Sequence, residues 1–138
     1  MTLTGHHFIA GRETAPNGHL FHAVNPTTSE QLEPAYGDAT HAEADEALQA
    51  AEAAFDALRL ATPETRAALL DAIADEITAL GDALLERAHA ECALPMARLT
   101  GERGRAIGQC KLFAALIREG SWADARVDHA IPDRQPLP

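Results

Sequence analysis

The sequence predicts a mainly α-helical chain in which four helices follow a short N-terminal β arm. Strand formers and turn residues fill residues 1–39, and helix start and stop signals divide residues 40–120 into four segments. Within those segments, apolar residues recur at three- and four-residue spacing, which is the period of one helix face. Residues 121–138 are expected to form a short strand, at about 125–127, and a proline-rich connector. A length of 138 residues fits one domain.

The β arm is predicted from two short runs rich in strand formers, residues 7–10 and 19–24. Between them lies Pro16-Asn17-Gly18, a turn signal because Asn and Gly tolerate positive φ. Side chains in the second run alternate in the manner of a half-buried strand. A third strand is expected at about residues 31–36.

The first helix is predicted to begin near His41, because Thr40-His41-Ala42-Glu43 is a capping box. In such a box the Thr hydroxyl accepts a backbone N–H, and the Glu carboxylate accepts the N–H of the Thr. One face of this helix is expected to be buried, and it consists of Ala44, Ala47, Leu48, Ala51, Ala54, Phe55 and Leu58.

The second helix is predicted to start at Thr62-Pro63-Glu64, with proline at the first helical position and an acid in the first turn. We expect Gly81 to end it and Asp82 to cap a third helix, which stops before Pro95. The buried stripe expected for the second helix consists of Leu69, Leu70, Ile73, Ile77 and Leu80.

The fourth helix is expected over residues 95–119, with Gly120 as its C-terminal stop. A second face, distinct from the apolar one, carries Gly101, Gly104, Gly108 and Ala115. Each interior glycine costs about 1 kcal/mol relative to alanine, so this face predicts the close approach of another backbone or a ligand. The apolar stripe consists of Met96, Leu99, Ile107, Cys110, Ala114 and Ile117.

The net charge of −10 and the pI of about 5.0 argue against nucleic acid or an anionic membrane as a partner, since both attract basic patches. The first residues lack the features of a signal peptide, and no apolar run approaches the roughly 20 residues that span a bilayer. A cytoplasmic protein with two reduced cysteines, Cys92 and Cys110, is expected. Both thiols are expected to lie in the core and to be inert.

No residue is predicted to act in catalysis, to bind a cofactor or to bind a metal. The glycines of the fourth helix follow the spacing G-x-x-G-x-x-x-G, which is neither a dinucleotide fingerprint nor a P-loop. His89 and Cys92 could share a metal but are only two ligands. His6-His7 and the pair His19 and His22 are equally unspecific.

Several segments together carry a family resemblance: Asn25-Pro26-Thr27-Thr28, residues 101–109 (Gly-Glu-Arg-Gly-Arg-Ala-Ile-Gly-Gln), Leu112-Phe113-Ala114 and Glu119-Gly120-Ser121-Trp122. From about Phe8 to Pro138 the chain resembles the N-terminal part of aldehyde dehydrogenases. Within that family it is most similar to the enzymes acting on α-ketoglutarate semialdehyde (2,5-dioxovalerate). The chain departs from the family at Ser29, where glycine is frequent, and at Ala106 and Cys110.

The resemblance implies an α/β parent fold with a doubly wound NAD(P)-binding domain, a catalytic domain with a nucleophilic cysteine, and a β-flap for oligomerisation. Complete members oxidise aldehydes to acids through a thiohemiacetal and a thioester, with hydride passing to the nicotinamide. Residues 1–138 resemble a segment that decorates the cofactor domain, and they lack the family's nucleophile, general base, oxyanion-hole asparagine and cofactor fingerprint.

The resemblance therefore implies a chain that binds no cofactor and is inactive alone, although the complete enzyme uses NAD or NADP. Its expected partner is the remainder of an aldehyde dehydrogenase or a homologous subunit, and the parent is expected to be a homo-oligomer. Arg103 and Arg105 would lie near the substrate entrance, where either could attract a carboxylated substrate. The alternative for Arg103 is a packed stem whose guanidinium reaches solvent or Glu102.

Two hypotheses of function follow. In the first, the chain is an N-terminal fragment of an aldehyde dehydrogenase, and its glycine face lacks a partner surface. In the second, it is a small non-catalytic helical interaction module that binds a homologue or a partner helix.

Overall fold

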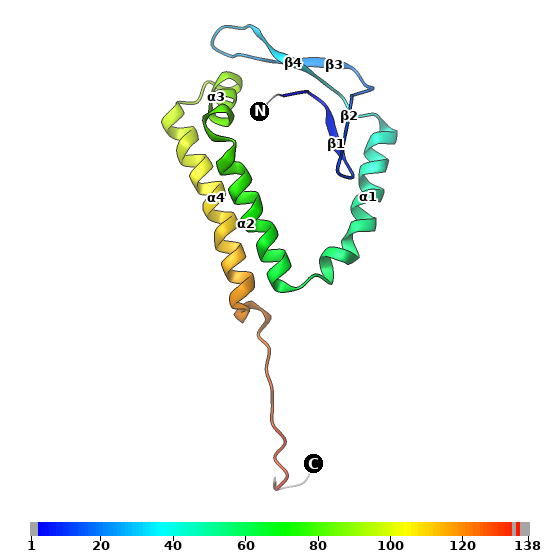
Figure 1. The fold of residues 1–138 in the computed structure, drawn as a ribbon, viewed down its shortest axis with the longest axis vertical. Helices are drawn as coiled ribbons and strands as arrows, with labels where there is room; N and C mark the ends of the chain where they lie inside the picture. The colour runs from blue at the N-terminus through cyan, green and yellow to red at the C-terminus, as the bar shows by residue number, and fades with distance from the viewer. Residues whose placement is uncertain (1–2, 134, 136–138) are drawn as a thin grey trace.

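The computed structural model describes residues 3–133 and 135, and it confirms four helices preceded by short strands. The strands pair as two separate antiparallel hairpins, of which β3–β4 lies across the top of Figure 1 and β1–β2 lies beside the upper part of α1. The first hairpin joins β1 (His7–Ile9) to β2 (Arg12–Thr14), and the second joins β3 (Leu20–Val24) to β4 (Gln31–Gly37).

The β2 strand was not expected from the sequence, because its residues are polar and show no apolar alternation. Ala10 and Gly11 form the turn between β1 and β2, both with positive φ, at 52° and 73°. The Pro16-Asn17-Gly18 segment instead connects the two hairpins.

The loop between β3 and β4 is organised by Asn25. Its side-chain Oδ1 accepts hydrogen bonds from the backbone N–H groups of Thr27 (2.9 Å) and Thr28 (3.3 Å). Ser29, at the position where the family often has glycine, has a left-handed φ of 62°. The prediction of a half-buried β3 with alternating side chains is wrong, since Leu20, Phe21 and Val24 are exposed and the exposed residues do not alternate.

The four helices begin and end close to the predicted residues: α1 at His41–Arg59, α2 at Pro63–Ala79, α3 at Gly81–Cys92 and α4 at Met96–Glu119. The capping box of α1 is present, and Thr62 caps α2. Gly120 ends α4 with a φ of 80°. The prediction that Asp82 caps α3 is wrong, because α3 follows α2 directly through Gly81, whose φ is 59°.

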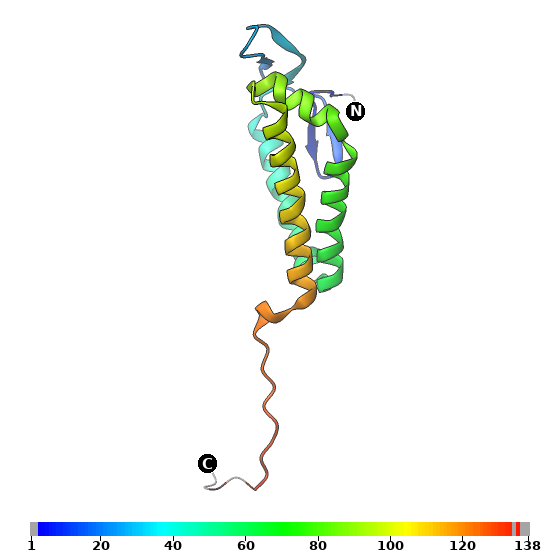
Figure 2. The same ribbon diagram turned by 90° about the vertical axis from the view of Figure 1, so that its left-hand side faces the viewer.

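The core of the helical part lies between α2 and α4, which run side by side in both views (Figures 1 and 2). Its centre consists of small side chains, since Ala67, Ala74 and Ala114 are all 0% exposed. Alanine at these positions lets the two backbones approach closely, at the cost of little buried apolar area per residue. Leu85 of α3 adds the one large buried apolar side chain in the described helices.

Helix α1 stands apart from this pair and diverges from α2 in Figure 1. The buried stripe predicted for α1 is wrong for this chain, because every one of its residues is exposed, including Leu48 (69%) and Phe55 (60%). The helix packs against β1 at its N-terminal end, where Asn17 also donates to Glu43 and Arg12 pairs with Glu46. The sequence therefore predicted the amphipathic face correctly, but no other part of the described chain covers it.

After α4 a 3-10 turn, η1 (Ser121–Ala123), leads into an extended tail that runs away from the helices (Figures 1 and 2). The strand predicted at residues 125–127 is wrong, since that segment pairs with no other strand. Isolated extended backbone has no ladder to join, which explains the difference. Part of the predicted connector, residues 134 and 136–138, lies outside the described residues.

Candidate functional site

The most prominent surface feature is the exposed apolar side of α1, which we call the α1 face. A fully exposed amphipathic helix is unusual, because isolated helices of this length are marginally stable in water. Large exposed apolar patches mark interaction sites in soluble proteins. The α1 face consists of Ala44, Ala47, Leu48, Ala51, Ala54, Phe55 and Leu58.

A second exposed surface lies on α4, on the side turned away from α2, and we call it the α4 outer face. Side chains added at its three glycines would meet no atom within 4 Å, so the glycines form open notches on the helix. The α4 outer face consists of Gly101, Gly104, Gly108, Leu112, Ala115 and Leu116.

These glycines do not form a phosphate-binding site. All three lie inside α4, where backbone N–H groups donate to carbonyls four residues earlier and are not free to hold a phosphate. A dinucleotide site needs a glycine-rich turn between a strand and a helix, whereas α4 directly follows α3. The α4 glycines therefore lack the geometry of either phosphate-binding motif.

Arg103 and Arg105, the two residues predicted for a substrate entrance, have different environments. The Arg103 guanidinium is partly buried and donates from Nη1 to the carbonyl oxygen of Gly81 at 2.7 Å. It thereby places a positive charge at the C-terminal end of α2, where a helix dipole favours cations. Of the two alternatives given for Arg103, a substrate contact and a packed side chain, its partly buried position agrees with the second. The guanidinium, however, bonds a backbone carbonyl and not solvent or Glu102.

Arg105 is mostly exposed and donates to the Glu102 carboxylate, with Nη2 and Oε2 at 2.7 Å. A shallow, open hollow of about 350 Å³ adjoins this pair, lined also by Ala106 and Gln109. The structure thus separates the two arginines, one tied to the α2–α3 junction and the other at the surface.

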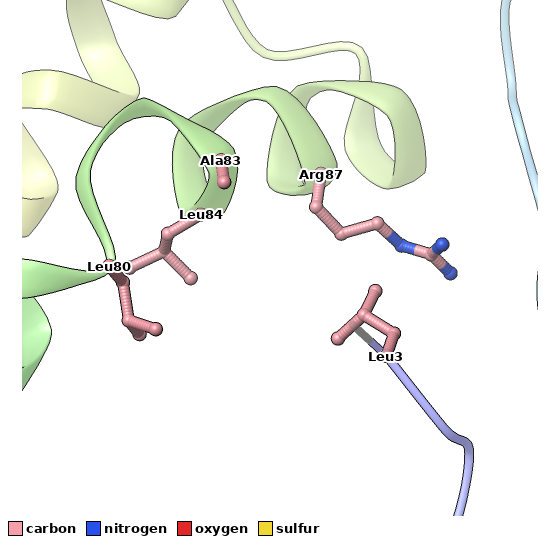
Figure 3. A pocket seen from close by; sticks show the side chains of 5 residues that line it. All are labelled: Leu3, Leu80, Ala83, Leu84 and Arg87. Carbon is pink, nitrogen blue, oxygen red and sulfur yellow. The ribbon is translucent and has the colours of Figure 1, made fainter. Parts of the chain in front are cut away.

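A small, partly enclosed pocket lies where the N-terminal segment meets α3 (Figure 3). Leu3, Leu80, Ala83 and Leu84 line it with apolar side chains, and Arg87 contributes its stem. Its volume of about 90 Å³ is well below the roughly 300–1,000 Å³ typical of ligand sites.

The polar end of Arg87 is already engaged elsewhere. Its guanidinium pairs with Glu91 at 2.6 Å, donates to the Glu33 carbonyl and lies 6.0 Å from the centre of the Tyr36 ring. These contacts tie α3 to β4, so Arg87 has a structural role. Only the Arg87–Glu91 spacing of four residues was visible in the sequence.

Neither cysteine lies in the core as predicted. Cys92 is exposed, because it ends α3 where no other element covers it, and Cys110 is half-buried beside α2. His89 Nδ1 lies 2.7 Å from the Leu94 carbonyl oxygen, a contact that closes the turn after α3. In the part of the chain that the structure describes, no three His, Cys, Asp or Glu side chains gather as metal ligands would.

Glu43 and Glu64, which belong to the helix start signals at Thr40 and Thr62, also bind distant segments that local spacing does not predict. Glu43, the one buried residue of α1, accepts from Thr40 and from Asn17 Nδ2 (3.0 Å), and it anchors α1 to the β arm. The backbone hydrogen bond from Thr40, more than any other contact, lowers the pKa of Glu43.

At the other end, Arg118 of α4 donates to Glu64 (2.8 Å) and Asp71 (2.7 Å) of α2. The hydrogen bonds from Arg118 lower the pKa of Glu64, and those to Glu64 and Asp71 raise the pKa of Arg118. In the chain Arg118 is 47 residues from Asp71 and 54 residues from Glu64, so no local spacing could have predicted these pairs.

No helix among the described residues combines the length and hydropathy that crossing a lipid bilayer requires.

Comparison with known proteins identifies the family to which this sequence is similar. The family model described as "Aldehyde dehydrogenase family" matches residues 13–137. The chain is 48% identical over 139 residues to alpha-ketoglutaric semialdehyde dehydrogenase 2 of Azospirillum brasilense, covering 100% of this chain and 26% of that relative. It is 42% identical over 134 residues to the alpha-ketoglutaric semialdehyde dehydrogenase of Acinetobacter baylyi, covering 97% and 26%.

Among solved structures, betaine aldehyde dehydrogenase of Staphylococcus aureus, in complex with NAD+, is similar with a TM-score of 0.78 and 24% identity. The similarity covers 96% of this chain and 27% of that one, and it concerns the fold alone. The chain thus spans about a quarter of the length of the curated relatives it matches.

Proposed function

Because the chain belongs to the aldehyde dehydrogenase family, we propose that it is the N-terminal segment of the cofactor domain of an NAD(P)-dependent aldehyde dehydrogenase. The complete enzyme oxidises an aldehyde to the acid, and α-ketoglutarate semialdehyde is the proposed substrate, since both curated relatives named above carry that activity in their names. It is a cytoplasmic homo-oligomer in this proposal.

The observation that carries the proposal is the pair of uncovered surfaces on a chain that spans a quarter of its relatives. The α1 face and the α4 outer face lie on different helices, and neither is covered by the described chain. A longer family member supplies further elements that can bury them. Residues 1–39 form the β arm of this segment, residues 40–120 its helices, and residues 121–138 lead toward the remainder.

In this proposal the role of the segment is structural, which the lack of a phosphate-binding motif at the α4 glycines supports. NAD or NADP, which accepts the hydride in the complete enzyme, binds outside residues 3–133 in this proposal. What the chain contributes is a rigid α2–α4 pair and two surfaces on which the remainder packs.

For the substrate we propose a role for Arg105 in preference to Arg103. Arg105 is exposed beside an open hollow, and an arginine there can attract the carboxylate of a semialdehyde. The Arg103 guanidinium is already engaged with Gly81.

The proposal is tested with the native product of the source cells, captured by an antibody raised to residues 1–138. We expect a protein several times larger than 14.7 kDa that reduces NAD+ or NADP+ when given α-ketoglutarate semialdehyde. A stable product of 14.7 kDa without that activity contradicts the proposal and favours the interaction module.

In the captured enzyme, Arg105→Gln should raise KM for the carboxylated aldehyde several-fold and leave KM for a neutral aldehyde of similar size unchanged. Arg103→Gln is the matched control, and it should lower the thermal midpoint without separating the two substrates. Equal effects of Arg105→Gln on both aldehydes contradict the role of Arg105.

A further inference from the structure

We propose that Arg66 of α2 binds a carboxylate of the remainder of the enzyme, brought to it by an apolar segment that covers this side of α2. We call the surface the α2 face, and it consists of Arg66, Leu69 and Ile73. The proposal rests on the proposed function, in which further elements of a longer family member pack on this chain, and it names the chemistry of one such contact.

Arg66 is the one arginine without a polar partner in the part of the chain that the structure describes. The residue is half-buried, and its Nε atom is buried and makes no hydrogen bond. Each of the other described arginines forms a side-chain hydrogen bond or an ion pair, with a carboxylate or a backbone carbonyl. A buried N–H group without an acceptor costs free energy and is rare in folded proteins. We therefore expect an acceptor for Arg66 that these residues do not supply.

The missing partner does not reflect a shortage of acidic residues, since the net charge of the chain is −10. On a helix the side chains three and four residues away are the neighbours, and around Arg66 these are threonine, proline and two leucines. The nearest carboxylates in the sequence are those of Glu64 and Asp71, and both accept from Arg118 of α4. The acidic residues close to Arg66 are thus engaged on another side of α2.

The α2 face is a different side of the helix from the one that α4 covers. At about 100° per residue, Arg66 lies within about 60° of Leu69 and Ile73 and about 100° from Ala67. Ala67 is fully buried in the contact with α4, whereas Leu69 is 48% and Ile73 40% exposed. Arg66 therefore stands beside two apolar side chains that no described element buries.

This combination determines what kind of segment fits the α2 face. An apolar segment that covers Leu69 and Ile73 also removes water from the guanidinium of Arg66. Removing water from an unpaired cation is costly, and the cost is offset only when the covering segment supplies a well-placed acceptor. A carboxylate accepts two parallel N–H groups from the planar guanidinium, so it matches this side chain better than a single neutral acceptor does.

The first test measures the thermal midpoint of the complete enzyme. Arg66→Met keeps an apolar stem but removes the charge, so the carboxylate loses its cation and the midpoint should fall by about 5 °C or more. Arg66→Lys keeps the charge and should lose clearly less. The matched control is Arg59→Met, because Arg59 is exposed and pairs only with Asp56 on its own helix. It should change the midpoint by less than about 1 °C.

The second test identifies the acceptor, and it decides the question even if Arg66→Met fails to fold. Lys111 is the only lysine in the sequence, so Arg66→Lys adds one amine to this segment. A water-soluble carbodiimide joins an amine to a carboxylate in contact with it as an amide, with loss of water. Mass spectrometry should find position 66 linked to an aspartate or glutamate outside residues 1–138. A link between Lys111 and Asp75, whose charged atoms lie 3.6 Å apart, is the positive control.

The outcomes separate this contact from the proposed activity. A longer, active enzyme whose midpoint is unchanged by Arg66→Met overturns the contact and leaves the activity standing. The same holds if position 66 links to a carboxylate within residues 1–138, or to none while Lys111 links to Asp75. A native product of 14.7 kDa overturns the proposed function and the contact with it.

Discussion

Helix α1 and the α2–α4 pair carry the same kind of sequence pattern and have opposite fates in the structure. The α2–α4 pair packs through three fully buried alanines, whereas Leu69 (48%) and Ile73 (40%) of the buried stripe predicted for α2 are exposed, so that prediction is wrong for these two residues. In α1 a stripe of equal regularity is exposed from end to end, and the helix is held near its N-terminal end by Glu43, by the Arg12–Glu46 ion pair and by contacts with β1. Apolar periodicity therefore predicts which face of a helix can be buried, but it does not predict which segment buries it.

The difference predicts where substitutions cost stability. Leu85→Ala should cost about 2–5 kcal/mol, because it empties a site in the helical core where the leucine is 4% exposed. The same substitution at Leu48 on α1 should change the free energy of unfolding by less than about 0.5 kcal/mol in the dilute monomer. Urea denaturation followed by circular dichroism measures both. Equal losses would mean that α1 is packed as well as α3.

The close approach of α2 and α4 can be tested at two adjacent residues. Ala114→Leu should cost about 1–3 kcal/mol, because the alanine is fully buried against α2 and the larger side chain has no room. Ala115→Leu, one residue along on the α4 outer face, should change stability by less than about 0.5 kcal/mol. Similar costs at both positions would show that the helix pair is not packed through its alanines.

The glycines of α4 should be a liability for the single chain. Gly108→Ala should stabilise the monomer by about 1 kcal/mol, since alanine favours helix and the added methyl group meets nothing within 4 Å. Gly81→Ala is the control of opposite sign, because its φ of 59° disfavours any side chain. Thermal melts of the dilute chain measure both. A loss of stability in Gly108→Ala would show that the glycine already has a partner within the monomer.

The smallest expected effect is a loss of thermal stability at acidic pH. Because the pKa of Glu64 is lowered in the folded chain, its pairing with Arg118 contributes stability above the ordinary carboxyl pKa of 4.5, and that contribution is lost as the pH falls through the lowered value. The thermal midpoint should fall between pH 5 and pH 3 and fall less in Glu64→Gln. Some loss should persist in that variant, since the pKa values of Glu43 and Glu119 are lowered too. If the thermal midpoint of Glu64→Gln falls with pH as much as that of the unchanged chain, Glu64 does not contribute to the acid sensitivity.

Features set by neighbouring residues were predictable from the sequence. The capping box at Thr40, the start of α2 at Thr62 and the stop at Gly120 depend on groups within a few residues of one another, and all three are confirmed. The β2 strand was missed because a hairpin turn of Ala10 and Gly11 can pair polar residues that carry no apolar signal. The strand predicted at residues 125–127 needs a neighbouring strand, which the described chain does not provide.

The site residues also differ in whether neighbouring or distant residues set their contacts. Arg103 was singled out because it interrupts an apolar stripe, and it is partly buried, but its bond to Gly81 depends on the sharp α2–α3 junction. The roles of Glu43 and Arg118 rest on contacts with distant segments, Asn17 for the first and α2 for the second. Such pairs follow from the tertiary arrangement, which no local pattern specifies.

Hydrogen exchange of residues 1–138, resolved by helix, tests most directly the claim that no other described element covers the apolar face of α1. In dilute solution the amides of α1 beyond Ala50 should exchange far faster than those of α2 and α4. Protection of α1 equal to that of α2 would contradict the account.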